Sequence, residues 1–145
     1  MKEKICAINK KVEGIGDKMQ DLSLLLIRLI LAFGFYTPAM MKWNDIHAIG
    51  DWFKSLGYPL PYLNAYMAGI TEVLGVILLI IGIGTRYISL LLIFVMFVAI
   101  TTVHLANGFE AGNNGFEIPI YYAVMLFVLF AFGPGKYSLK TIIKK

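Results

Sequence analysis

Two ionisable side chains in this sequence interrupt long apolar stretches. Glu72 is the only charged residue between positions 60 and 83, and Arg28 is the only one between 22 and 41. A charged group inside a membrane is costly, so such residues mark a functional site or a pairing that holds helices together. A buried carboxylate can take up a proton or bind a ligand, and a guanidinium can pair with it. Arg28 and Glu72 are therefore candidates for a buried polar site.

His104 and Glu117 form a second candidate set, at the two ends of a short polar loop. Histidine–carboxylate pairs transfer protons or support a bound metal, so this pair would connect a buried site to the outer face. His104, His47 and Glu117 are also candidate metal ligands, but their spacing matches no metal-binding motif and no metal is assigned. The alternative for His104 is an interfacial side chain bonded to a backbone carbonyl.

The composition indicates that these residues belong to a membrane protein. Of the 145 residues, 59% are hydrophobic and only 15% are charged, whereas a soluble domain has about 25% charged residues. Four apolar stretches are near the length needed to cross a bilayer, and in lipid they must be helices to satisfy their backbone groups. They cover about 22–41, 60–83, 87–106 and 116–132. We expect an all-α membrane protein with four transmembrane helices in an antiparallel bundle.

Basic residues predict how these helices are oriented. Most lysines and arginines flank the first and last stretches, whereas the first outer loop contains only Lys42 and Lys54. The positive-inside rule therefore places both termini in the cytoplasm. The net charge of +4 follows from these lipid-facing flanks and needs no nucleic-acid partner. In the same outer loop, the apolar spacing of residues 46–56 predicts a short interfacial helix, with Asn44 or Asp45 as its N-cap.

The predicted four-helix domain covers residues 22–135 and lies between two polar segments. A basic cytoplasmic tail follows at 136–145, and residues 1–21 come before the domain. In 1–21, apolar residues recur at alternating spacings of three and four with lysines on the other side. This pattern is typical of an amphipathic helix lying on the inner membrane surface. Gly14 and Gly16 weaken such a helix, so a partly ordered segment is the alternative.

Familiar catalytic and redox motifs are absent from the sequence. The only cysteine is Cys6, so the chain alone has no C-x-x-C pair that could cycle between a dithiol and a disulfide. There is no glycine-rich nucleotide loop, zincin motif or serine elbow. A self-sufficient enzyme is therefore disfavoured, and redox chemistry would depend on a bound cofactor.

Helix geometry argues against a direct pair between Arg28 and Glu72. At 1.5 Å per residue they lie about 9 and about 16 Å from the cytoplasmic ends of their helices. Because Cα–Cβ bonds lean toward each helix N-terminus, the two side chains lean apart in antiparallel helices. Two roles stay open for each residue: Arg28 extends to the inner headgroups or serves a site, and Glu72 is a structural carboxyl or a site residue. Glu72 shares its face with small residues, which predicts that this face packs inside the bundle.

Four segments resemble the DoxX family in their order and spacing. They are "LIRLILAFGFYTPAMMKW" (26–43), "GITEVLGVILLIIGIGTR" (69–86), "VAITTVHLANGF" (98–109) and "GPGKYSL" (133–139). The match includes Arg28, Lys42, Glu72 and His104, whereas Ala39 stands where the family usually has glycine. The resemblance implies a four-helix protein of the bacterial inner membrane. Members of this family include the small subunit of a thiosulfate–quinone oxidoreductase, proteins of thiol homeostasis, and companions of systems that make metal-handling peptides.

Two functional hypotheses follow from the residues and the resemblance. In the first, the chain is a membrane subunit of a redox or thiol-homeostasis system and contacts quinone or a partner protein. Glu72 and Arg28 would then hold the quinone or move its proton, and His104 with Glu117 would connect the site to the outside. In the second, the chain is a non-catalytic assembly, export or metal-handling component, in which Glu72 and Arg28 lock the helices together. Quinone is the candidate cofactor, and a partner subunit or a second copy is the candidate protein partner.

Overall fold

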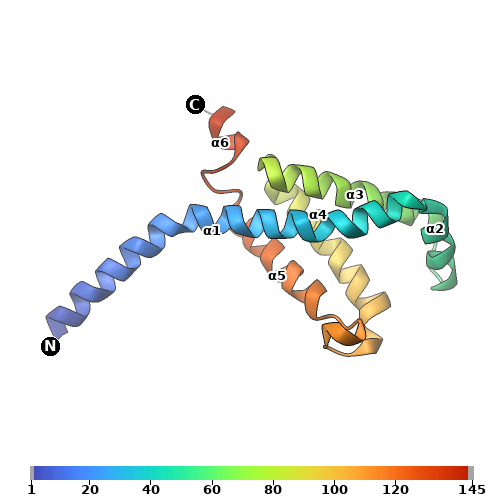
Figure 1. Ribbon diagram of the computed structural model, residues 1–145, viewed down its shortest axis with the longest axis horizontal. Helices are drawn as coiled ribbons and strands as arrows, with labels where there is room; N and C mark the ends of the chain where they lie inside the picture. Colours follow the sequence, from blue (N-terminus) through green and yellow to red (C-terminus); the bar gives the residue numbers. More distant parts are fainter. Residues whose placement is uncertain (1, 144–145) are drawn as a thin grey trace.

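The computed structural model describes residues 2–143, and every regular element in that range is helical. The helices are α1 (Lys2–Asn44), α2 (Ile46–Ser55), α3 (Pro61–Ile81), α4 (Thr85–Ala99), α5 (Glu117–Phe132) and α6 (Leu139–Ile143) (Figure 1). A π-helical turn (Ile100–His104) and a 3₁₀ turn (Leu105–Asn107) continue α4, and another 3₁₀ turn (Ala111–Asn113) precedes α5. The all-α class expected from the composition is confirmed.

Three helical stretches are long and apolar enough to cross a membrane. They are Asn9–Asn44 within α1, Pro61–Ile81, and Thr85–Asn107 with its π and 3₁₀ turns included. The fourth apolar helix, α5, has 16 residues, which is about 24 Å of helix against a hydrocarbon core of about 30 Å. The helices therefore have the length and composition of a membrane protein.

A single apolar core lies between α1, α3, α4 and α5. It includes Leu31 and Phe35 from α1, Leu79 from α3, Leu92 from α4 and Leu126 from α5, none of them more than 1% exposed. α1 packs against α3, and α4 packs against both α3 and α5. The N-terminal part of α1, blue in Figure 1, extends away from all of these helices.

The turn between α3 and α4 depends on two glycines in the left-handed region. Gly82 has a φ of 74° and Gly84 a φ of 61°, which other residues adopt only with strain. Gly82 is also confined in space, because a Cβ there would lie 2.5 Å from Cβ of Ser138 and 2.8 Å from Nη2 of Arg28. This tight turn brings α4 back against α3.

The first helix is longer than its apolar stretch. α1 runs through Pro38 and ends at Asn44, so Lys42 lies in its last turn. The assignment of Lys42 to the first outer loop is therefore wrong, because the helix continues past the end of the apolar residues. The short helix expected in this loop is α2, whose N-cap Asp45 accepts a hydrogen bond from the Ala48 N–H at 2.9 Å.

Candidate functional site

Glu72 lies on a face of α3 that packs inside the protein. The buried residues of this helix recur every three or four positions, namely Ala65, Gly69, Glu72, Gly75 and Leu79. At Gly75 the approach of α4 is close enough that a Cβ would lie 2.8 Å from Cδ1 of Leu92. The small residues thus let neighbouring helices approach, and the Glu72 side chain is left only 3% exposed.

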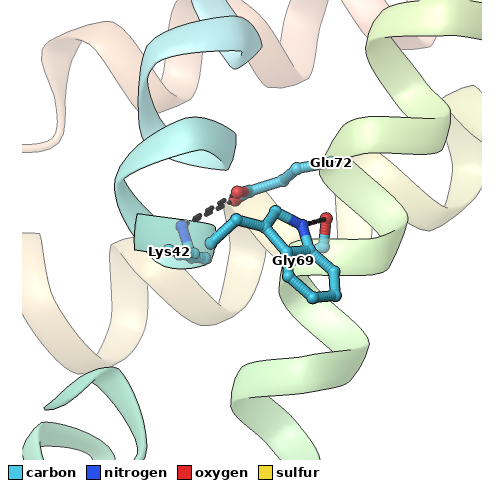
Figure 2. A network of polar contacts seen from close by, with 4 residues as sticks. Lys42, Gly69 and Glu72 are labelled. Atoms are coloured by element: carbon cyan, nitrogen blue, oxygen red, sulfur yellow. Dashed lines mark hydrogen bonds and ion pairs between the residues drawn. The ribbon is translucent and has the colours of Figure 1, made fainter. Parts of the chain in front are cut away.

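Lys42 is the partner of this buried carboxylate. Its ammonium Nζ donates to both carboxylate oxygens, at 3.0 Å to Oε1 and 2.9 Å to Oε2, and Figure 2 shows the two side chains directed toward each other from α1 and α3. The Lys42 side chain is 17% exposed. The pair therefore joins a carboxylate that is shut off from the surface to an ammonium that still reaches it.

The directions of α1 and α3 explain why Lys42, and not Arg28, reaches Glu72. The two helices run in opposite directions, because Arg28 contacts Leu79 late in α3 while the later Lys42 contacts the earlier Glu72. Each Cα–Cβ bond leans toward its own helix N-terminus. Lys42 and Glu72 therefore lean toward each other, whereas Arg28 leans toward the C-terminal end of α3.

Aromatic rings border the Lys42–Glu72 pair. The indole Nε1 of Trp43 donates to the carbonyl of Gly69 at 3.3 Å, one turn before Glu72 along α3 (Figure 2). The ring of Tyr66 packs edge-on against Trp43 with a centroid distance of 6.2 Å. Trp43 and Tyr66 are 42% and 37% exposed, so flat apolar surface lies beside the ion pair at the edge of the protein.

Arg28 is buried and binds backbone carbonyls. Its side chain donates to Leu79 at 2.7 Å, Ile80 at 2.7 Å, Pro134 at 2.9 Å and Tyr137 at 2.8 Å. Being 1% exposed, it does not extend to the surface, so the expectation that it reaches the headgroups is not what the structure shows. The last four carbonyls of a helix lack partners within the helix. Arg28 supplies two of them at the end of α3 and ties the C-terminal segment to the same point.

A second arginine does the same for α5. Arg86, at the start of α4, donates from Nη2 to the carbonyl of Ala131 at 3.0 Å. Positive charge near a helix C-terminus is favourable because the helix dipole is negative there. Arg28 and Arg86 thus hold the ends of α3 and α5, and neither arginine belongs to the site at Glu72.

His104 and Glu117 have separate partners. The Nδ1 atom of His104 lies 2.8 Å from the carbonyl oxygen of Asn114, which is the alternative that the sequence left open for this histidine. Glu117 accepts from the N–H of Ala111 at 3.0 Å and from the hydroxyl of Tyr121 at 3.2 Å. In residues 2–143 no hydrogen bond or ion pair joins His104 to Glu117. Both side chains instead hold the loop between α4 and α5.

The third candidate metal ligand, His47, lies on α2. Its ring is exposed and packs near Tyr62, with ring centroids 6.1 Å apart. Across the described part of the chain, no three His, Cys, Asp or Glu side chains gather where they could hold a metal ion. The residues singled out as metal candidates are therefore not brought together by this fold.

Sequence reasoning missed Lys42 as a site residue, although a signal was present. One face of α1 is marked by residues at spacings of three and four, and the last member of that series is Lys42. The series is Leu24, Arg28, Leu31, Phe35, Ala39 and Lys42, of which the first five are at most 5% exposed. Extending this period past the apolar stretch would have placed Lys42 on the buried face.

Comparison with known proteins agrees with these features. The model of the DoxX family matches residues 23–105, a range that contains both Lys42 and Glu72. A Haemophilus influenzae protein named "Uncharacterized protein" is 34% identical over 143 residues, covering 93% of this chain and 90% of that protein. A Bacillus subtilis protein named "Putative oxidoreductase CatD" is 30% identical over 101 residues, covering 70% of this chain and 73% of that protein. No solved structure matches the chain. The matched range, together with the apolar helices, establishes that this chain is a membrane protein of the DoxX family.

Proposed function

We propose that this protein is a membrane subunit of a redox system and that the Lys42–Glu72 pair binds the polar head of a lipid-soluble quinone. The buried ion pair is the observation that carries the proposal. The similarity to a protein named as an oxidoreductase supports the reaction class. In this proposal α1, α3, α4 and α5 all cross the bacterial inner membrane, with both chain termini in the cytoplasm. The length of α5 then requires a locally thinner bilayer or flanking residues at the interface.

The chemistry of the pair suits a quinone carbonyl. A lysine ammonium has three N–H donors, and Lys42 uses them on the Glu72 carboxylate, so one can turn toward an incoming oxygen. When a quinone accepts two electrons it also takes up two protons, and a buried carboxylate beside the oxygen is placed to relay one of them. The electrons would come from a partner protein that carries a redox group. The chain would supply binding, orientation and proton transfer.

A ligand would approach this pair from the lipid side. The accessible edge of Lys42 lies beside the exposed rings of Trp43 and Tyr66, which offer flat apolar surface for a quinone ring. Two shallow surface depressions lie elsewhere, along residues 16–27 and around the segment that follows α5. Neither depression includes Lys42 or Glu72, so the proposed ligand lies in neither of them.

The second candidate function is non-catalytic, as a component for assembly, export or metal handling. The observation in its favour is that Lys42 already satisfies both oxygens of Glu72. The pair would then hold α1 against α3 and bind nothing. A closed pair of this kind would make the ionic groups replaceable by others that keep the helices together.

Bound quinone distinguishes the two functions. Protein purified in mild detergent would be extracted and its quinone quantified by mass spectrometry, for the unmodified chain, Glu72→Gln and Asp51→Asn. Glu72→Gln keeps the shape of the side chain and removes its charge, whereas Asp51 lies on α2 and bonds only to Tyr62. Loss of quinone in Glu72→Gln alone supports the redox function. Equal quinone in all three proteins, or none in any of them, refutes it and favours the second candidate.

A further inference from the structure

The exposed face of α1 carries an apolar stripe with a strict coiled-coil period. Ten residues follow one another at alternating spacings of three and four, without interruption. They are Ile5, Ile8, Val12, Ile15, Met19, Leu22, Leu26, Leu29, Phe33 and Tyr36. This average spacing of 3.5 residues is the signature of a helix that winds around another helix in a left-handed coiled coil.

This stripe is not used inside the protein. From Val12 to Tyr36 its members are between 38% and 81% exposed. The buried face of α1, which contains Leu31 and Phe35, lies on the opposite side of the helix and packs against the other helices. The same helix therefore has one face that is satisfied by its own chain and a second apolar face that is not.

Lipid contact does not account for the whole stripe. α1 has 43 residues, which is about 64 Å of helix and more than twice the hydrocarbon thickness of about 30 Å. The part around Val12, Ile15 and Met19 thus lies outside the bilayer core. To lie flat on the membrane surface this part would need a sharp turn before the span, but α1 continues as one helix from Lys2 to Asn44.

The extension also lacks support from its own chain. Nothing lies within 4 Å of where a Cβ would stand at Gly14 or Gly16. Each glycine costs a helix about 1 kcal/mol relative to alanine, and a short helix without packing partners is marginal in water. A continuous helix through these glycines therefore calls for a partner on its apolar stripe.

We propose that this partner is a second copy of the chain, and that the two α1 helices form a parallel two-stranded coiled coil. Both copies are anchored in one membrane in the same orientation, which fixes the helices as parallel and in register. In a parallel coil, Lys11 and Lys18 lie opposite the partner's Gly16 and the partner's Ser23, so no like charges meet. An antiparallel coil would instead bring the lysines together. This inference does not depend on the proposed quinone site.

Disulfide cross-linking of the full-length protein in its membrane tests the dimer. In a Cys6→Ser background, Ile15→Cys on the stripe is expected to give a linked dimer on oxidation, because residues on the seam bring their Cβ atoms close. The control Asp17→Cys lies on the outer side of the same helix and is expected to give none. Equal linking of both variants, or no product from Ile15→Cys, would overturn the proposal. So would a product whose mass is not twice that of the chain, because it would identify another protein as the partner.

Two neighbouring substitutions test the seam without a cross-link. Met19→Glu places a carboxylate on the stripe of each copy, and Gln20→Glu places the same charge one residue away on the outer side. Subunit counting by single-molecule photobleaching in lipid nanodiscs is expected to show dimers for the unmodified chain and Gln20→Glu, and mostly monomers for Met19→Glu. Monomers throughout, or the same dimer fraction in both variants, would contradict a coiled coil at this face.

Discussion

The Lys42–Glu72 pair predicts that its two partners are unequal in their contribution to stability. At about 3 Å and an effective dielectric constant of about 20, their attraction is about 5 kcal/mol before the cost of burial is counted. Lys42→Met leaves the Glu72 carboxylate 3% exposed and unpaired, and removing one partner of a buried pair costs about 3–5 kcal/mol. Glu72→Gln leaves an ammonium that is 17% exposed and can turn to the surface, so this change costs only about 1 kcal/mol.

A double-mutant cycle measures the coupling between the two residues. The double variant Lys42→Met with Glu72→Gln has no unpaired charge, so it is expected to be more stable than Lys42→Met alone. The free energy of unfolding would be measured for all four proteins by denaturant titration in the same detergent micelles. Equal losses in the two single variants, or losses that simply add in the double variant, would refute the pairing and the reasoning from exposure.

Three further substitutions test other contacts in the structure. Arg28→Lys keeps the charge but has at most three donors at a single point, so the unfolding free energy should fall by about 2–3 kcal/mol as carbonyls lose charge-assisted bonds. Gly82→Ala should lower the melting temperature more than Gly84→Ala, because both have positive φ but only Gly82 would meet Ser138 and Arg28. Cys6→Ser should change neither the melting temperature nor the quinone content, because Cys6 is exposed and lies outside the proposed site. A loss of quinone in this variant would mean that the thiol has a role.

The local pattern of the chain determined the class of fold and the buried face of α3. Apolar length predicted the helices, since in lipid a backbone can satisfy its polar groups only within a helix. The small residues Ala65, Gly69 and Gly75 correctly placed Glu72 inside, because a stripe at helical spacing is a property of one helix alone. The same local reasoning kept open a backbone carbonyl as the partner of His104, and Asn114 supplies it.

Only the tertiary structure decided which groups these side chains bind. Arg28 bonds to carbonyls that lie 51 to 109 positions away along the chain, and backbone carbonyls have no signature in a sequence. Glu72 finds Lys42 because α1 continues past its apolar stretch and runs opposite to α3, so that the two side chains lean together. The sequence determined by itself that a carboxylate would be buried. The crossing of the two helices decided that a lysine, and not an arginine, would pair with it.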